Sequence, residues 1–384
     1  MSMKLRRRYI FGIICNFFVL LYLFLNFVIR VFDNSIISLR LCLFSLLVSC
    51  VCSFFCYSKK NYLCFLYILL FIVSWFIELI FKPEWQYSFD YFVYSVSYML
   101  VAMFLVQWSQ QVFALRVLFI FVMVSILVKL LLFDTPIREF MLDESSYNFI
   151  SVLALLYFGL YCLTLIKNNK PLSLKDGFLF LVVCCLAYGR GGIISALCFL
   201  GLLLVYKFYN ARIGANKKVL IGFLVLLSII FFHSLLLDRL SDYEIFGKFK
   251  KMGMESNGRA DIWLKFINNS FSSFKDFILG ANPAKIFSEG NLHNSYLQMY
   301  ANFGFVFFIS NVFITILILI YYSRKRSRNI WLLILFVTFI VRALLDRVCF
   351  RGHCEILYFY FIFNFFIDIS TKNKVVDCKL YKSL

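Results

Sequence analysis

The chain has 384 residues, of which 62% are hydrophobic and 20% aromatic, while only 15% are charged. A soluble globule of this size has too little interior to bury so much apolar surface, so the composition excludes an ordinary soluble domain. The formal net charge of +19 would suit a nucleic-acid-binding protein. The Lys and Arg residues, however, cluster in the gaps between apolar stretches, which argues against nucleic acid as a partner and is typical of membrane topology.

Apolar stretches of about twenty residues predict transmembrane helices, because a chain in lipid must satisfy its backbone hydrogen bonds internally. The stretches lack the period-two alternation of barrel strands. In chain order, the predicted spans cover residues 9–29, 36–57, 62–81, 91–109, 113–133, 148–166, 176–188, 193–206, 219–237, 295–322, 329–345 and 354–370. The sequence therefore predicts an all-α, polytopic inner-membrane protein of about 12 transmembrane helices.

The distribution of positive charge predicts the orientation of these spans. The segments assigned to the cytoplasm hold 22 of the 39 Lys and Arg residues, whereas the short outer loops hold six. The cytoplasmic segments are 1–8, 58–61, 110–116, 167–175, 207–218, 323–328 and 371–384. We therefore expect both the N- and the C-terminus to be cytoplasmic.

A short hairpin interrupts the regular pattern of spans. The predicted spans 176–188 and 193–206 are short, and only Gly189-Arg190-Gly191-Gly192 divides them. This arrangement places Arg190 slightly below the outer membrane surface. The neighbouring glycines have no side chains, so another group can approach their backbone closely.

A long outer segment, 238–294, separates the ninth span from the tenth. It divides the chain into 1–237 with nine spans, the large periplasmic loop itself, and 295–384 with three spans and a cytoplasmic tail. Connections of this length usually carry function. Within the loop, apolar residues recur at helical spacing at Ile262, Trp263, Phe266, Ile267, Phe271, Phe274, Phe277 and Ile278. We predict an amphipathic helix near 259–279, lying apolar face down as a lid over the opening between the spans.

Two arginines in this outer region are candidate anion ligands. Arg190 stands beside glycine amides, and the amides of Gly191 and Gly192 together with a guanidinium group suit a phosphate. The alternative is an arginine that contacts lipid headgroups. Arg259 begins the predicted lid helix, where a positive charge is unfavourable unless an anion is shared. The alternative there is a solvated charge in a basic loop.

His293 and Asn294 lie immediately before the tenth span. A histidine at the outer mouth suits a general base or a hydrogen-bond donor, next to helix amides that can hold a phosphate. The alternative is a polar residue at a helix end, with Asn294 as the cap. His293 is the stronger of the chain's three histidines as a catalytic candidate, and Asn294 is a substrate-binding candidate.

Ionisable residues also crowd the outer ends of the last two spans. They are Arg342, Asp346, Arg347, Arg351, His353 and Glu355. At membrane depth such groups face a cavity or one another, and a structural ion-pair network is the favoured interpretation. Arg342, the nearest to the membrane interior, and Arg347 are kept as further substrate-binding candidates.

The sequence contains no metal signature of the HExxH, paired Cys-x-x-Cys or acidic-cluster type, and no P-loop. A transferase built on this chain is therefore expected to work without a metal or other cofactor. Positive side chains would then stabilise the departing phosphate.

The order of motifs in the outer segment resembles the signature of the O-antigen polymerase (Wzy) and O-antigen ligase (WaaL) superfamily. The residues that carry the resemblance are Asn257-Gly258-Arg259, Trp263, Leu279-Gly280, His293-Asn294 and Gly304. Phe307 stands where the ligase pattern has Gly, Thr or Tyr. Gly189-Arg190-Gly191 is similar to the family's Ser-Arg-Gly element, with Gly189 in place of Ser.

The resemblance implies a GT-C-type, inverting, metal-independent glycosyltransferase of the bacterial inner membrane. Its donor and acceptor would be undecaprenyl-pyrophosphate-linked glycans, and a chain-length regulator protein would be a further partner. Arg190 and Arg259 would bind the donor pyrophosphate, and His293 would position or deprotonate the acceptor hydroxyl. Polymerase is preferred over ligase because of Phe307. A lipid-linked oligosaccharide flippase is the alternative from another class, although it has little use for a 57-residue outer loop.

Overall fold

The computed structural model describes residues 3–32, 36–56, 62–82, 88–108, 112–132, 147–187, 189–211, 259–283, 292–324, 328–349 and 354–380. Every regular element within these ranges is a helix. Eight helices precede the outer segment: α1 (Met3–Val31), α2 (Ile36–Phe55), α3 (Tyr62–Phe81), α4 (Ser88–Gln107), α5 (Val112–Leu132), α7 (Tyr147–Lys167), α8 (Leu174–Leu186) and α9 (Arg190–Asn210). Five more follow: α12 (Arg259–Ser270), α13 (Phe274–Leu279), α15 (Ser295–Ser323), α16 (Arg328–Leu345) and α17 (Glu355–Leu380).

Eleven of the predicted spans coincide with helices, and most helix ends lie within a few residues of the predicted ends. Helix α17 continues beyond the predicted end of its span. The predicted span 219–237 lies outside the described residues. Seven helices are long and apolar enough to cross a membrane: Tyr9–Val31, Ile36–Phe55, Tyr62–Phe81, Val112–Leu131, Phe149–Lys167, Arg190–Asn210 and Ser295–Ser323. The prediction of an all-α, multi-pass membrane protein is confirmed.

The full count of about 12 spans is not reached within the described residues. Helices Phe92–Gln107 and Ile330–Leu345 are apolar but shorter than a complete span. Helix α8 has 13 residues, which at about 1.5 Å per residue is too short to cross a hydrocarbon layer of about 30 Å. Helix α8 therefore serves as the short arm of a hairpin with α9, against which it packs closely.

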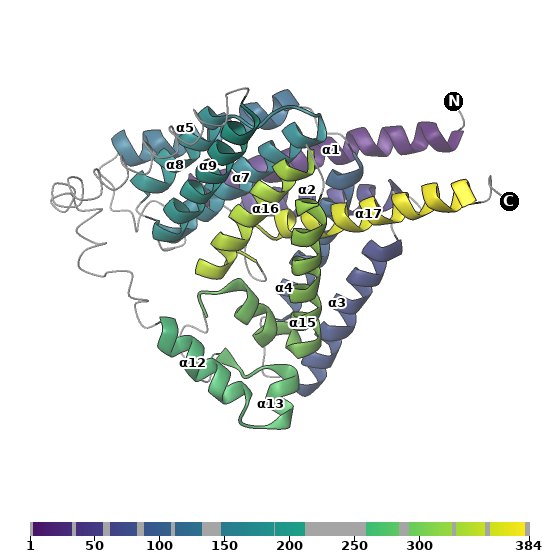
Figure 1. The fold of residues 1–384 in the computed structure, drawn as a ribbon, viewed down its shortest axis with the longest axis vertical. Coiled ribbons are helices and arrows are strands. Elements are labelled where there is room, and N and C mark those ends of the chain that lie inside the picture. Colours follow the sequence, from purple (N-terminus) through teal and green to yellow (C-terminus); the bar gives the residue numbers. More distant parts are fainter. Residues whose placement is uncertain are drawn as a thin grey trace.

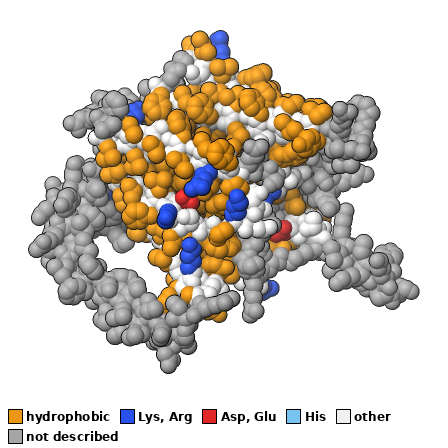
Figure 2. Space-filling model, turned by 90° about the horizontal axis from the view of Figure 1, so that it is seen from above, with side chains coloured by type: hydrophobic (Ala, Val, Ile, Leu, Met, Phe, Trp, Pro, Cys, Tyr) orange, Lys and Arg blue, Asp and Glu red, His pale blue; other side chains and the backbone are white. Residues whose placement is uncertain are grey.

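Helix α7 is the centre of the bundle. Its apolar window is 94% buried, whereas the windows of the other spanning helices are 28–44% buried. It contacts α5, α8, α9, α16 and α17. The helices at the periphery of the bundle instead expose large apolar side chains. Hydrophobic side chains cover most of the described face in Figure 2. The start of α1 and the end of α17 lie on the same side of the molecule (Figure 1).

The predicted lid helix near 259–279 is wrong as a single helix. The structure divides it into α12 and α13 at residues 271–273. Ser273 is the N-cap of α13, and its Oγ accepts a hydrogen bond from the amide of Asp276 at 3.0 Å. Serine side chains compete for backbone groups in this way, which favours a helix start over helix continuation.

The buried face of α12 packs against protein rather than against lipid. Phe266, Leu292 and Tyr300 belong to a small hydrophobic cluster separate from the main core. The indole Nε1 of Trp263 donates to the carbonyl of Leu292 at 2.7 Å. The lid segment is therefore attached to the first half of α15.

Helix α13 is held at the end of α3. The Nζ of Lys82 donates to the carbonyls of Leu279 and Gly280, and lies 3.1 Å from the carboxylate of Glu78. Gly304 kinks α15 at this level with φ of 75°, a left-handed conformation that favours glycine. A Cβ at Gly304 would lie 2.9 Å from Oε1 of Glu78, so the close approach also requires a residue without a side chain.

Candidate functional site

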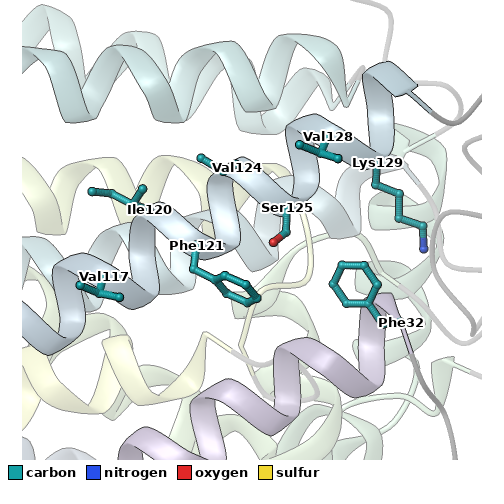
Figure 3. A pocket seen from close by; sticks show the side chains of 8 residues that line it. All are labelled: Phe32, Val117, Ile120, Phe121, Val124, Ser125, Val128 and Lys129. Atoms are coloured by element: carbon teal, nitrogen blue, oxygen red, sulfur yellow. The ribbon is translucent and has the colours of Figure 1, made fainter.

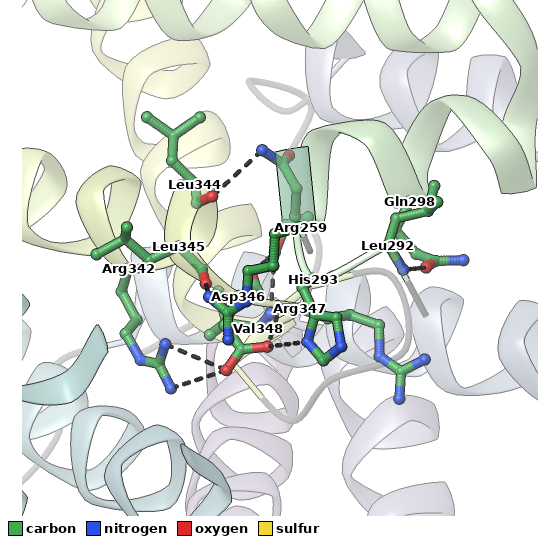
Figure 4. Close-up of polar contacts among 12 residues, drawn as sticks. Arg259, Leu292, His293, Gln298, Arg342, Leu344, Leu345, Asp346, Arg347 and Val348 are labelled. Carbon is green, nitrogen blue, oxygen red and sulfur yellow. Dashed lines mark hydrogen bonds and ion pairs between the residues drawn. The ribbon is translucent and has the colours of Figure 1, made fainter. Parts of the chain in front are cut away.

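Four side chains from three parts of the chain meet where α12 begins and α16 ends, and Arg190 at the start of α9 lies within electrostatic range of one of them, Arg259. Arg190 opens α9, Arg259 opens α12, His293 directly precedes α15, and Arg342 and Asp346 lie at and just after the end of α16. Figure 4 shows all of them except Arg190. We call these five residues the Arg–Asp–His cluster. The structure thus brings two candidate catalytic residues, Arg259 and His293, together with the candidate binding residue Arg342 around Asp346, and Arg190 lies within electrostatic range of Arg259.

Asp346 is the centre of the cluster. Its Oδ2 lies 3.4 Å from Nη1 of Arg342, and its Oδ1 lies 3.6 Å from Nδ1 of His293. The amide of Arg347 donates to Oδ1 at 2.8 Å. Burial raises the pKa of Asp346, but His293, Arg342, the Arg347 amide and the charge of Arg259 together hold this pKa well below its usual value. Asp346 is therefore a carboxylate at neutral pH.

Arg342 is fully buried and joins the cluster to the central helix. Its Nη2 lies 3.2 Å from the hydroxyl of Ser151 on α7. A Cβ at Gly191 would lie 2.4 Å from Nη1 of Arg342, and one at Gly192 would lie 2.3 Å from Cβ of Ser151. The two glycines therefore make room for Arg342 and for the contact between α9 and α7.

The Gly189–Gly192 hairpin is tighter than the sequence indicated. Gly189 is the N-cap of α9, so Arg190, Gly191 and Gly192 form its first turn instead of dividing the two helices. Gly191 and Gly192 are buried, and their packing contacts account for the absence of side chains. Their proposed contact with a substrate stays a prediction.

Arg259 connects the outer segment to the end of α16. Its Nη1 donates to the carbonyl of Leu345 at 2.6 Å. Arg259 also lies close enough to act electrostatically on both Arg190 and Asp346. Within the Arg–Asp–His cluster, Arg342 and Arg259 thus act on the single carboxylate of Asp346, and Arg190 adds a third positive charge near Arg259. This surplus of positive charge suits an anion that approaches Arg190 and Arg259.

His293 has φ of 48°, an uncommon conformation for a residue with a side chain. The turn that it forms ends at Asn294, whose Oδ1 accepts from the amides of Tyr296 and Leu297 at 2.9 and 3.1 Å. Its Nδ2 donates to the carbonyl of Leu344 at 3.2 Å. The interpretation of Asn294 as a helix cap is confirmed, and its role in substrate binding stays a prediction.

Ser295 binds the start of α15 to the loop after α16. Its hydroxyl donates to the carbonyl of Asp346 at 3.0 Å and accepts from the amides of Val348 and Cys349 at 2.9 and 3.2 Å. These bonds fix the backbone on both sides of the contact between His293 and Asp346. The imidazole is therefore positioned by the fold and remains 27% exposed.

No family model matches this chain, and no curated protein matches it. The resemblance to the O-antigen superfamily consequently rests on the motifs and their order alone.

Asp346 is the functional candidate that the sequence analysis did not single out. The sequence predicts Asp346 only as a member of an ion-pair network at the ends of the last two spans. Arg342 and Asp346 do form an ion pair. Its contact with His293 has no signal in the local sequence, because the two residues lie on different elements. Arg351 and His353 lie outside the described residues, and Glu355 accepts a hydrogen bond from Ser95 at 2.7 Å.

Arg347 is half-buried beside Asp346. Burial lowers the pKa of Arg347, and the neighbouring carboxylate of Asp346 opposes this shift. The backbone amide of Arg347 donates the hydrogen bond to Asp346. A role of the Arg347 side chain in substrate binding stays a prediction.

An apolar groove of about 490 Å³ lies between α5 and the end of α1 (Figure 3), and none of its lining residues belongs to the Arg–Asp–His cluster. It is lined by Phe32, Val117, Ile120, Phe121, Val124, Ser125, Val128 and Lys129. The ammonium group of Lys129 donates to the carbonyl of Val31, so it is engaged by the protein itself. A groove of this lining offers little chemistry, and we do not assign the site to it.

Alanine at Gly191 or Gly192 is expected to lower the free energy of unfolding by about 1–3 kcal/mol, because each new Cβ overlaps a buried group. Thermal unfolding of the purified protein in detergent measures this. The matched control is Gly201→Ala on the same helix, where a Cβ meets nothing within 4 Å among the described residues. The control should not lower stability, since alanine is the better helix former. Equal effects at all three positions would contradict the packing role.

Proposed function

We propose that this protein is an O-antigen polymerase, which joins undecaprenyl-pyrophosphate-linked oligosaccharide repeat units at the periplasmic face of a bacterial inner membrane. The observation that carries the proposal is the contact of His293 with Asp346 beside Arg259, whose charge also acts on Arg190. The order of motifs around these residues supports it. The complete fold in this proposal has about 12 spans of GT-C type with both termini in the cytoplasm.

Arg190 and Arg259 would bind the donor diphosphate. Both stand at helix starts, where backbone amides add a partial positive charge that favours phosphate. Guanidinium groups bind phosphate oxygens in bidentate fashion, and each such bond to a charged group contributes about 1.5–3 kcal/mol. Two arginines can therefore offset the charge that develops on the leaving diphosphate without a metal ion.

His293 would receive the proton of the acceptor hydroxyl. In this step the hydroxyl oxygen bonds to the anomeric carbon of the donor glycan, and the bond from that carbon to the diphosphate oxygen breaks. The electron pair leaves with the lipid diphosphate, and the proton passes to the imidazole. Asp346, 3.6 Å from Nδ1, would hold the ring with Nε2 toward the acceptor and stabilise the imidazolium that forms.

The lid segment would position the donor. Helix α12 begins with Arg259 and is attached to α15 through Trp263 and Phe266, so the guanidinium group and His293 are held by one small cluster. The growing chain would move from its lipid diphosphate to a hydroxyl of the next lipid-linked unit. A chain-length regulator would act as a partner of the complete enzyme.

The test is the lipopolysaccharide of a deletion strain, separated on a gel and complemented with the wild-type gene. A core that carries a single repeat unit supports the polymerase. A bare core with accumulating lipid-linked polymer would instead indicate the ligase, with lipid A core as acceptor. A bare core without outward-facing repeat units would indicate a flippase. Either of the last two results rejects the proposal.

A further inference from the structure

Helix α12 has a second apolar edge whose side chains are exposed in the described part of the chain. Phe266 on its inner face is fully buried, whereas Leu264, Ile267 and Phe271 are 58%, 36% and 66% exposed. The spacing of three and four residues places these three side chains on one edge of the helix. The opposite edge carries exposed polar residues, among them Lys265 and Asn269.

The turn after α12 extends this apolar edge. Phe274, the first residue of α13, is 81% exposed. The ring of Phe271 lies 5.3 Å from that of Phe277, which in turn lies 4.7 Å from the ring of Phe305 on α15. Beyond Phe305, α15 exposes an apolar stripe at Val306, Ile309, Phe313, Ile316 and Ile320. The aromatic rings therefore continue the lipid-facing stripe of a spanning helix onto the turn.

The end of α3 gives the depth of this turn in the membrane. Ile77, Ile80 and Phe81 in its last turns are 42%, 68% and 53% exposed, so lipid must reach the end of this spanning helix. Lys82 directly follows and binds the last carbonyls of α13. Figure 1 shows α13 beside the end of α3, and its contacts with Tyr300 and Phe305 place it next to the kink of α15. The α12–α13 turn thus stands at the boundary between acyl chains and water.

We infer that the α12–α13 turn, with Phe271 and Phe274 at its tip, inserts into the membrane interface on the side where α3 ends. Phospholipid is the partner of this surface. Aromatic and aliphatic side chains enter the boundary between headgroups and acyl chains, and exposed Lys265 and Lys275 on the same segment suit anionic headgroups. The inference rests on exposure and contacts alone and is independent of the chemistry of the Arg–Asp–His cluster.

The insertion has a mechanical consequence for α12. The helix is held on its inner face by the cluster around Phe266 and on its outer edge by lipid. Because α12 is a single rigid helix of 12 residues, anchoring its last turn also sets the height of Arg259 at its start. The membrane thereby becomes part of what positions this guanidinium group.

Site-specific photo-crosslinking of the full-length protein tests the inference. The amino acid p-benzoylphenylalanine replaces Phe271, Phe274 or, as the matched control, Asn269 on the polar edge of the same helix. The variants are reconstituted in vesicles of phosphatidylethanolamine and phosphatidylglycerol, irradiated, and analysed by mass spectrometry. We expect phospholipid adducts several-fold more abundant at 271 and 274 than at 269. An unchanged thermal unfolding midpoint shows that each variant is folded.

Three results would overturn the inference. The first is equal lipid adducts at all three positions, and the second is their absence at 271 and 274. The third is crosslinking of 271 or 274 to another polypeptide, which would assign the surface to a second copy or to a protein partner. A failed polymerase assay has no bearing on these outcomes, so the two proposals are tested separately.

Discussion

Alanine at Arg190 or at Arg259 is expected to lower the rate of polymer formation by on the order of 10²–10³-fold, the usual cost of removing one charge-stabilising donor from a transition state. The reason is that each guanidinium group would offset charge on the leaving diphosphate. Lysine at either position should restore only part of the rate, since an ammonium group keeps the charge but loses bidentate geometry. The measurement is polymer formed per unit time by the purified protein in lipid vesicles with a lipid-linked repeat unit.

The control for this prediction is Lys207→Ala, which removes an exposed positive charge from the same helix as Arg190. It should leave the rate unchanged. Arg259→Ala also removes the bond to the Leu345 carbonyl, which costs about 1 kcal/mol of stability, so the unfolding midpoint must be measured in parallel. A rate close to that of the wild type in either alanine variant would remove the physical basis of the enzyme assignment.

Asparagine at Asp346 is expected to lower the free energy of unfolding by about 3 kcal/mol, because it leaves the fully buried Arg342 without a countercharge. Replacing Arg342 by methionine in the same chain removes that buried charge. The double variant should therefore be more stable than Asp346→Asn alone. Thermal unfolding of the two single variants and the double variant completes the cycle. Additive effects would show that Arg342 and Asp346 do not stabilise each other.

The stability that Asp346 contributes, measured by thermal unfolding, should change with pH in a defined direction. The folded-state pKa of Asp346 lies below its ordinary value of 3.8. The carboxylate therefore contributes stability that is fully present above about pH 4 and is lost as the pH falls through the lower folded-state pKa. The difference in unfolding midpoint between wild type and Asp346→Asn should shrink as the pH falls below 4, because the wild-type carboxylate then takes up a proton. A difference that grows below pH 4 would contradict the assigned ionisation.

The proposed role of Asp346 in positioning His293 can be tested by comparing the polymerisation rates of single and double variants. His293→Ala should reduce polymer formation by on the order of 10²–10⁴-fold, the range of a general base. Adding Asp346→Asn to this variant should reduce the rate little further, because a positioning residue has no effect once its imidazole is gone. Independent, multiplying losses would show that Asp346 acts in some other way.

The sequence by itself determined the secondary structure and membrane character of this protein. Long apolar stretches without alternation predicted helices in twelve places, and each of the eleven within the described residues coincides with a helix. Composition and hydropathy are local properties, and lipid allows helices little alternative, since backbone groups have no water to bind. The cap at Asn294 was predictable for the same reason, because its bonds join residues two and three positions apart.

Only the tertiary structure decided the composition of the site and the surfaces of the lid. The contact of Asp346 with His293 and the space that Gly191 leaves for Arg342 join residues far apart in the chain, so no local pattern carries them. The apolar residues of 259–279 predicted one face, but Ser273 starts a second helix and the residues divide between a buried side and an exposed edge. Helical periodicity reports which residues share a side of a helix, whereas the neighbouring elements decide whether that side meets protein or lipid.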